Sequence, residues 1–336
     1  MEQSAGWPQR GGPLSRPEGL AVLGLVVGAA ALRSVSWMQT AVLFNDGPLF
    51  LHMARSFAAG DLASALAHPY HPLYPALVAL VQPLLGGWEG AAVFVSVVGG
   101  ALAVGALFAF LRASFGPREA LIGAFLLAVH PWTIQFSADV QSEGLYLAFF
   151  LAALACLWQA LARASWVGAL GAGLFTGLAY LTRPEGLILA LVGVAVGMGA
   201  VVWRRLPPLR AAGLAAVAAG ALVASAAPYV LLLHEQTDEW LLTRKKVVSQ
   251  ILGVEAYRGP VQTRATSYDE PRLAVLDPPA GSESPVAPGS SGTRSLVAAV
   301  VTVLDTGQSV LRPDMLLLLL VGLWGARGRP GLRGAL

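Results

Sequence analysis

The sequence contains few charged residues and a single cysteine. Charged side chains make up only 12% of its 336 residues, whereas soluble domains carry about 25%, so an ordinary soluble protein is excluded. Cys156 stands alone inside an apolar run, which excludes a disulfide framework and a cysteine-based metal site. The sequence also lacks a Gly-rich phosphate loop and leaves no room for a Rossmann-like domain. We therefore expect no nucleotide cofactor.

Apolar residues dominate the chain instead. They make up 56% of it, and the mean hydropathy is +0.64. In lipid such continuous runs form helices, and they do not alternate as barrel strands do. The sequence therefore predicts an all-α polytopic membrane protein, a bundle of about eight to ten transmembrane helices. The expected spans are residues 19–36, 72–86, 90–111, 118–130, 140–162, 167–181, 186–203, 211–233, 295–311 and 314–325.

Arginine clusters in short segments beside these runs, a pattern that sets orientation. Arg10 and Arg16 precede the first run, "WRRLPPLR" (203–210) separates two later ones, and a basic tail follows at 327–336. All three should be cytoplasmic, so the first span runs outward. We expect a multi-pass protein of the plasma (inner) membrane with a cytoplasmic N-terminus and no cleaved signal peptide. The net charge of +3 reflects this pattern, and no nucleic-acid partner is expected.

The chain is expected to form one membrane core with polar loops. Its expected parts are a cytoplasmic leader (1–17), a transmembrane core (18–233) with an external loop (37–71), a second external loop (234–294), a C-terminal membrane segment (295–326) and the basic tail (327–336). The second loop is rich in Pro, Gly and Ser towards its end. Such a composition buries little apolar surface, so part of this loop should be flexible.

The first external loop should contain a short amphipathic helix. Asp46 followed by Gly47 and Pro48 reads as its start, with Asp46 as N-cap, and Gly60 reads as its stop. One face is apolar and the other polar, so the helix should lie along the outer membrane surface. The apolar face carries Leu49, Phe50, Met53 and Phe57, and the polar face carries His52, Arg55 and Ser56.

Three motifs place polar groups at the mouths of apolar helices: "HPYHPLYPAL" (68–77), "HPWTIQFSADVQSEGLYL" (130–147) and "YLTRPEGLIL" (180–189). Together with the acidic Asp46 after the first span, and in this order, they resemble the membrane glycosyltransferases of family 39. These enzymes have the GT-C fold and are related to protein O-mannosyltransferases and lipid A aminoarabinose transferases. The resemblance covers residues 40–200 best. It implies an extracytoplasmic active site and a sugar donor carried on a polyprenyl phosphate.

Glycosyl transfer from a lipid phosphate needs a base for the acceptor hydroxyl and cations for the departing phosphate. Asp46 best suits the base, although Gly47 stands where many family members have Glu; its other interpretation is a helix cap alone. Asp139 and Glu143 are four residues apart and share a helical face if the helix has begun. They either bind a divalent cation or orient the acceptor as further catalytic groups, or they form an N-cap and a first-turn acid.

Other polar residues at these mouths are candidates for substrate binding. Arg183 can grip a phosphate with its planar guanidinium, while Glu185 fits a capping box with Thr182. The cations of "TRKK" suit either a lipid phosphate or anionic head groups. The remaining candidates are ambiguous, because they also suit packed interfacial residues. The full set is His68, His71, Tyr74, Arg183, Glu185, Arg244, Lys245 and Lys246.

If every apolar run crosses the membrane, Asp139 lies on the opposite membrane face from Asp46. The two residues could then not belong to one site. One of the short runs therefore does not fully cross, or forms part of a broken helix. The leading prediction is an inverting glycosyltransferase acting on a protein, lipid or glycan acceptor at the outer face of the bilayer. The alternatives are a transporter or flippase of lipid-linked sugars, whose charges would line a pathway, and a truncated non-catalytic membrane subunit.

Overall fold

The computed structural model describes residues 14–245, within one compact unit. This part of the chain is helical and contains no strand, which confirms the all-α prediction. Its elements are α1 (Arg16–Met38), α2 (Gly47–Ala58), α3 (Leu62–Leu66), α4 (Leu73–Leu85), α5 (Trp88–Ser114), α6 (Pro117–Val129), α7 (Pro131–Ser137), α8 (Glu143–Ala162), α9 (Trp166–Thr182), the 3-10 helix η1 (Pro184–Leu187), α10 (Ile188–Val202) and α11 (Pro208–Thr237).

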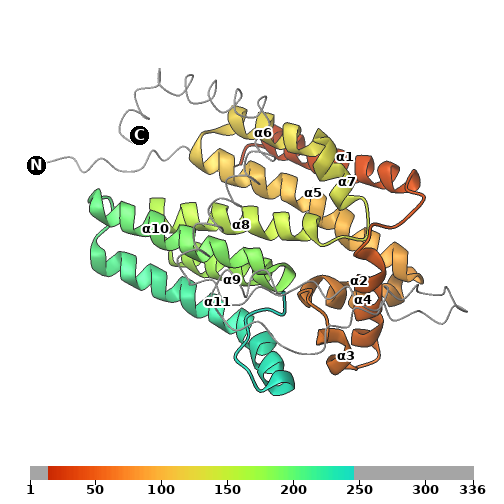
Figure 1. Ribbon diagram of the computed structural model, residues 1–336. Helices are drawn as coiled ribbons and strands as arrows, with labels where there is room; N and C mark the ends of the chain where they lie inside the picture. Colours follow the sequence, from red (N-terminus) through yellow and green to blue (C-terminus); the bar gives the residue numbers. More distant parts are fainter. Residues whose placement is uncertain (1–13, 246–336) are drawn as a thin grey trace, which may run out of the picture. The chain divides into compact units, whose positions relative to one another are not determined.

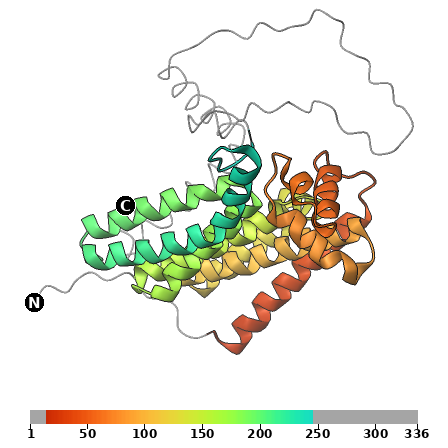
Figure 2. The ribbon, with the colours of Figure 1, turned by 90° about the horizontal axis from the view of Figure 1, so that it is seen from below.

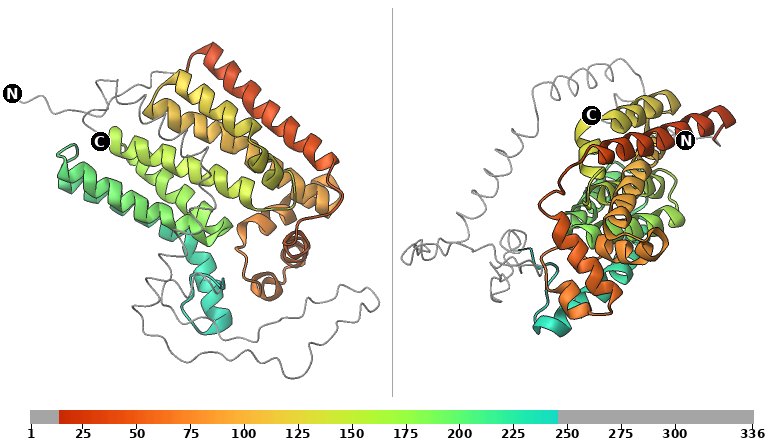
Figure 3. Two further views of the ribbon diagram at one scale, coloured as in Figure 1. Left: turned by 45° about the horizontal axis from the view of Figure 1, so that its top comes forward. Right: turned by 90° about the vertical axis from the view of Figure 1, so that its right-hand side faces the viewer.

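The long helices lie side by side as a bundle, with the short helices α2, α3 and α4 gathered at one end (Figure 1, Figure 3). The pairs α5–α8, α8–α9 and α9–α11 pack most extensively. Glycine allows their backbones to approach closely, as is common between membrane helices. A Cβ on Gly99 would lie 2.6 Å from the backbone nitrogen of Leu145, and one on Gly173 would lie 2.0 Å from the carbonyl oxygen of Ala218.

The described residues support a polytopic membrane protein. Five helices are long and apolar enough to cross a membrane, namely α1, α5, α8, the continuous η1–α10 segment and α11. The count is six if α6 and α7 form one bent span, and α4 and α9 are shorter apolar helices. The runs expected at 295–311 and 314–325 lie outside the described residues, as do most of the leader, most of loop 234–294 and the basic tail.

The sixth candidate span is broken at Pro131, where α6 and α7 meet at an angle of 59°. Proline has no N–H and cannot continue the helical ladder, so carbonyls before it lose their partners. The Thr133 hydroxyl donates to the carbonyl of Leu127 (2.9 Å), and Nη1 of Arg33 donates to that of Ala128 (3.3 Å). The side chains thus satisfy the backbone at the break.

Helix α4 begins and ends at the same end of the bundle. After the turn at Gly86, the ring of Trp88 at the start of α5 lies 5.8 Å from the guanidinium of Arg55 in α2. The far end of α5 lies beside the start of α1, where Arg112 pairs with Glu18 at 3.0 Å. We call the end that holds α2–α4 the α2 end. Helix α4 is also one of the shorter apolar helices, so among the expected spans 72–86 best fits the short run that was predicted not to cross.

Helix α2 begins and is amphipathic as predicted, and it ends at Ala58 with Ala59 as C-cap, so Gly60 in the left-handed conformation (φ 74°) stops it as predicted. Its apolar face is occupied by protein. Phe50 and Met53 are buried in a cluster with Tyr74 of α4 and Val93 of α5. Helix α2 packs this face against α4 and α5, and the short helices lie together at one end of the bundle (Figure 2).

Candidate active site

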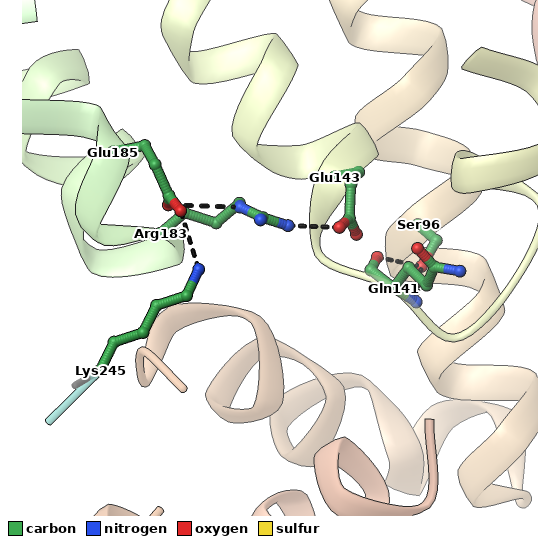
Figure 4. Close-up of polar contacts among 6 residues, drawn as sticks. All are labelled: Ser96, Gln141, Glu143, Arg183, Glu185 and Lys245. Carbon is green, nitrogen blue, oxygen red and sulfur yellow. Dashed lines mark hydrogen bonds and ion pairs between the residues drawn. The ribbon is translucent and has the colours of Figure 1, made fainter. Parts of the chain in front are cut away.

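A chain of four alternating charges lies at the α2 end (Figure 4). The guanidinium of Arg183 pairs with Glu143 and, at 3.5 Å, with Glu185. Glu185 also accepts a bond of 2.8 Å from the ammonium of Lys245. All four side chains are about one third exposed, at 28% to 35% of their surface. The groups come from the start of α8, the α9–η1 junction and the segment after α11, and they form one partly solvated ionic network.

The α9–η1 junction directs Arg183 and Glu185 towards each other. Helix α9 ends at Thr182, whose hydroxyl donates to the carbonyl of Leu178 in its own helix. Arg183 is extended (φ −153°, ψ 139°), and the 3-10 helix starts with Pro184. The predicted capping box between Thr182 and Glu185 is therefore wrong. The Glu185 carboxylate is instead engaged by Arg183 and Lys245.

Asp46 precedes α2 in the N-cap position but makes no capping hydrogen bond with its side chain. Its interpretation as a cap alone is therefore wrong. Its carboxylate instead lies near Tyr70. Burial and the neighbouring Asp46 carboxylate raise the pKa of Tyr70, Arg183 lowers it and Glu143 raises it. Asp46 and the ionic network thus share one neighbourhood, because the loop before Asp46 is also bonded to Asp139 just ahead of Glu143.

Asp139 lies in the break between α7 and α8. Its carboxylate accepts hydrogen bonds from the backbone N–H of Phe44 (3.2 Å) and of Val140 (2.6 Å). Helix α8 begins only at Glu143, so the expectation that Asp139 and Glu143 share a helical face is wrong. Backbone N–H groups thus hold the Asp139 carboxylate against the loop that leads to Asp46.

The two histidines of the 68–77 motif lie in different surroundings. His71 is 1% exposed, its Nε2 lies 3.0 Å from Oγ1 of Thr243, and burial lowers its pKa to about 3. His68 is partly exposed and packs edge-on against His52 at 5.4 Å. Burial lowers the pKa of His68, with smaller contributions from the charges of His52 and Arg244. A neutral and enclosed His71 is unsuited to hold a phosphate by charge.

Tyr74 does not open towards the site. It is fully buried, and its hydroxyl donates to the carbonyl of Ala92 (3.0 Å) and bonds the hydroxyl of Ser96 (2.9 Å). Ser96 in turn donates to the carbonyl of Gln141 (2.8 Å), in the loop just before Glu143. The structure therefore does not bring Tyr74 to the substrate side, and its polar group serves the α4–α5–α8 contact.

The basic segment after α11 reaches the site only in part. Lys245 joins the ionic network, while Nη2 of Arg244 donates to the side-chain oxygen of Gln236 (3.0 Å). Lys246 lies outside the described residues.

Within residues 14–245 no three His, Cys, Asp or Glu side chains converge as metal ligands would, so we assign no metal site.

Arg33 of α1 is a buried polar residue that the sequence analysis did not select. It is 1% exposed, and its Nε donates to the hydroxyl of Ser137 (2.6 Å) while Nη1 donates to the carbonyl of Ala29 (3.0 Å). A cavity of about 220 Å³ beside it is also lined by Glu143. The signal in the sequence is an arginine inside an apolar run, because a charge in lipid is costly and usually marks a functional site.

The family model described as "Dolichyl-phosphate-mannose-protein mannosyltransferase" matches residues 67–230, just under half of the chain. The match includes His68, Asp139, Glu143 and Arg183, and it ends before the 243–246 segment. Asp46 lies outside it. No curated protein and no solved structure was found to match the chain. The match confirms the resemblance to membrane glycosyltransferases that the motifs indicated, and it supports a glycosyltransferase in a membrane environment.

Proposed function

We propose that this protein transfers a sugar from a polyprenyl-phosphate carrier to an acceptor hydroxyl at the extracytoplasmic membrane face. One observation carries the proposal. The loop that leads to Asp46 is bonded at Phe44 to Asp139, four residues before Glu143, so Asp46, which makes no capping bond, lies at the same end of the bundle as the Glu143–Arg183–Glu185–Lys245 network. A base and cations in one partly solvated mouth are what transfer from a lipid phosphate requires.

Each group has a defined task in this reaction. Asp46 takes the proton of the acceptor hydroxyl as its oxygen forms a bond to the anomeric carbon. The bond from that carbon to the phosphate oxygen breaks, and the phosphate leaves with the electron pair. Attack opposite the leaving group inverts the anomeric centre. Arg183 and Lys245 hold the departing phosphate, because charge-assisted hydrogen bonds from cations are the strong ones.

The distribution of arginine supports an extracytoplasmic site. The end of the bundle opposite the α2 end carries the helix termini that are rich in arginine, and such termini face the cytoplasm. They carry Arg16, Arg112, Arg118, Arg163, Arg204, Arg205 and Arg210. The α2 end then faces outward, and the N-terminus is cytoplasmic. We propose that the protein resides in the plasma membrane in this orientation.

The test supplies radiolabelled polyprenyl-phosphate sugars to membranes that contain wild-type protein or Asp46→Asn. We expect new glycosidic bonds with wild type and a loss of most of that product with the variant. Asp61→Asn is the matched control, because Asp61 also precedes a helix at this end but caps it through a bond from the N–H of Ser64 (3.0 Å). Carrier-dependent movement of sugar without new glycosidic bonds would indicate a flippase instead.

A further inference from the structure

The segment that leaves α11 is fastened to the site by its side chains and its backbone. The hydroxyl of Thr243 lies 3.0 Å from Nε2 of His71, and the hydroxyl of Tyr180 donates to the carbonyl of Leu242. Thr243 and Leu241 are 3% and 2% exposed. The side chains of Leu241 and Thr243 are therefore built into the core, while Leu242 is held by its carbonyl and its side chain is exposed.

Three aromatic rings from separate elements surround this attachment. The ring of His71, just before α4, lies 5.0 Å from that of Tyr180 in α9 and 5.1 Å from that of Tyr229 in α11. The two tyrosine rings are 6.1 Å apart. Because the three elements are far apart in sequence, the His71–Thr243 contact forms only when the bundle has assembled.

The Thr243 hydroxyl also determines where the next cation lies. It accepts a hydrogen bond from the backbone N–H of Lys245 (3.1 Å), and the Lys245 ammonium then reaches Glu185 at 2.8 Å. One hydroxyl thus links the buried imidazole to the backbone of Lys245. We infer that His71 and Thr243 are positioning residues that place Lys245 in the ionic network where the donor phosphate binds.

This inference rests on the proposed function for the identity of the ligand, but the placement of Lys245 does not depend on it. A lysine on an unattached segment would lose side-chain and backbone freedom on binding a phosphate, which weakens binding. A lysine that is already held loses less. The expected consequence of loosening the attachment is a higher KM for the lipid donor, with kcat at saturating donor retained.

Hydrogen–deuterium exchange of residues 241–245 in detergent-solubilised full-length protein tests the placement. Thr243→Val keeps the shape of the side chain and removes the hydroxyl, whereas Thr243→Ser keeps the hydroxyl. We expect exchange in this segment to be roughly fivefold faster in Thr243→Val, since a hydrogen bond contributes about 1 kcal/mol, and close to wild type in Thr243→Ser. Equal exchange in both variants would overturn the attachment.

Transfer from a radiolabelled polyprenyl-phosphate sugar tests the positioning role. We expect Thr243→Val and Tyr180→Phe to raise the donor KM several-fold and Thr243→Ser to restore it, with kcat within about twofold of wild type. Faster exchange with an unchanged donor KM would overturn the role in donor binding. Failure of the wild type to transfer sugar would refute the proposed function and with it the donor role, while the exchange experiment would still decide whether Thr243 holds the segment.

Discussion

The carboxylate of Asp139 accepts a hydrogen bond from the backbone N–H of Phe44, 95 positions earlier in the chain. This bond joins the loop after α1 to the break before α8. Asp46 follows Phe44 by two residues, and Glu143 follows Asp139 by four. A single side chain therefore fixes the loop of the proposed base relative to the helix that brings Glu143 into the ionic network.

Asp139→Ala should lower transfer more than Asp139→Asn does. Alanine removes both backbone hydrogen bonds, to Phe44 and to Val140, whereas asparagine keeps one oxygen that can accept. Each lost bond is expected to cost about 1 kcal/mol in holding the loop. Steady-state kinetics with thermal unfolding measured in parallel would check this order. A rate for Asp139→Ala equal to that of wild type would show that the anchor does not serve the reaction.

Asp46→Asn should remove most turnover and leave thermal stability unchanged. General-base catalysis contributes about 10²- to 10⁴-fold, and an amide cannot take the proton. The stability should hold because the carboxylate makes no capping hydrogen bond that the substitution would break. A large drop in the unfolding temperature at an unchanged rate per folded molecule would reverse the assignment and make Asp46 a structural residue.

Arg183→Gln should lower transfer by roughly one to two orders of magnitude, as a lost charge-assisted hydrogen bond contributes about 1.5 to 3 kcal/mol. Joint replacement of Lys245 and Lys246 should instead mainly raise the KM for the lipid donor. Kinetics over a range of donor concentrations separates the two effects. If the double lysine variant lost turnover at saturating donor while Arg183→Gln matched wild type, the lysines rather than Arg183 would be the main groups that bind the departing phosphate.

Gly100→Ala should destabilise the fold by about 1 to 3 kcal/mol, the usual cost of overpacking. A Cβ at this position would lie 2.5 Å from Nε of Arg33 and from the hydroxyl oxygen of Ser137. Gly24→Ala is the matched control, because nothing lies within 4 Å of a Cβ there. Denaturant unfolding in detergent measures both. Equal stabilities would show that the Arg33–Ser137 contact adapts without cost.

Acid should weaken the fold through His71. Burial lowers its pKa from 6.5 to about 3, so between these values the unfolded chain binds a proton that the folded chain does not. Stability attributable to this group is complete above about pH 6.5 and falls by about 1.4 kcal/mol per pH unit below it. His71→Asn should flatten this slope between pH 6.5 and 4.5. Unfolding free energies measured across that range would check it, and identical slopes would contradict it.

The sequence by itself determined the class of fold, because apolar runs of this length leave the backbone no arrangement in lipid other than helices. The order Asp46-Gly47-Pro48 also determined the start of α2. Polar groups beside apolar runs lie at helix ends, so the sequence located the three polar motifs at the ends of apolar helices. The family match confirmed the resemblance carried by the motifs in residues 67–230. These features depend on residues close together in the chain.

Tertiary structure decided which run does not cross and which polar groups meet. Helix α4 is as apolar as a span, and only its packing beneath α2 shows that it returns to the same end. The partners of Glu143 and Asp139 lie 40 and 95 positions away, so no local pattern predicts them. For the same reason His71 and Tyr74 were predicted to bind substrate: the sequence shows that they are polar but does not show which distant groups enclose them.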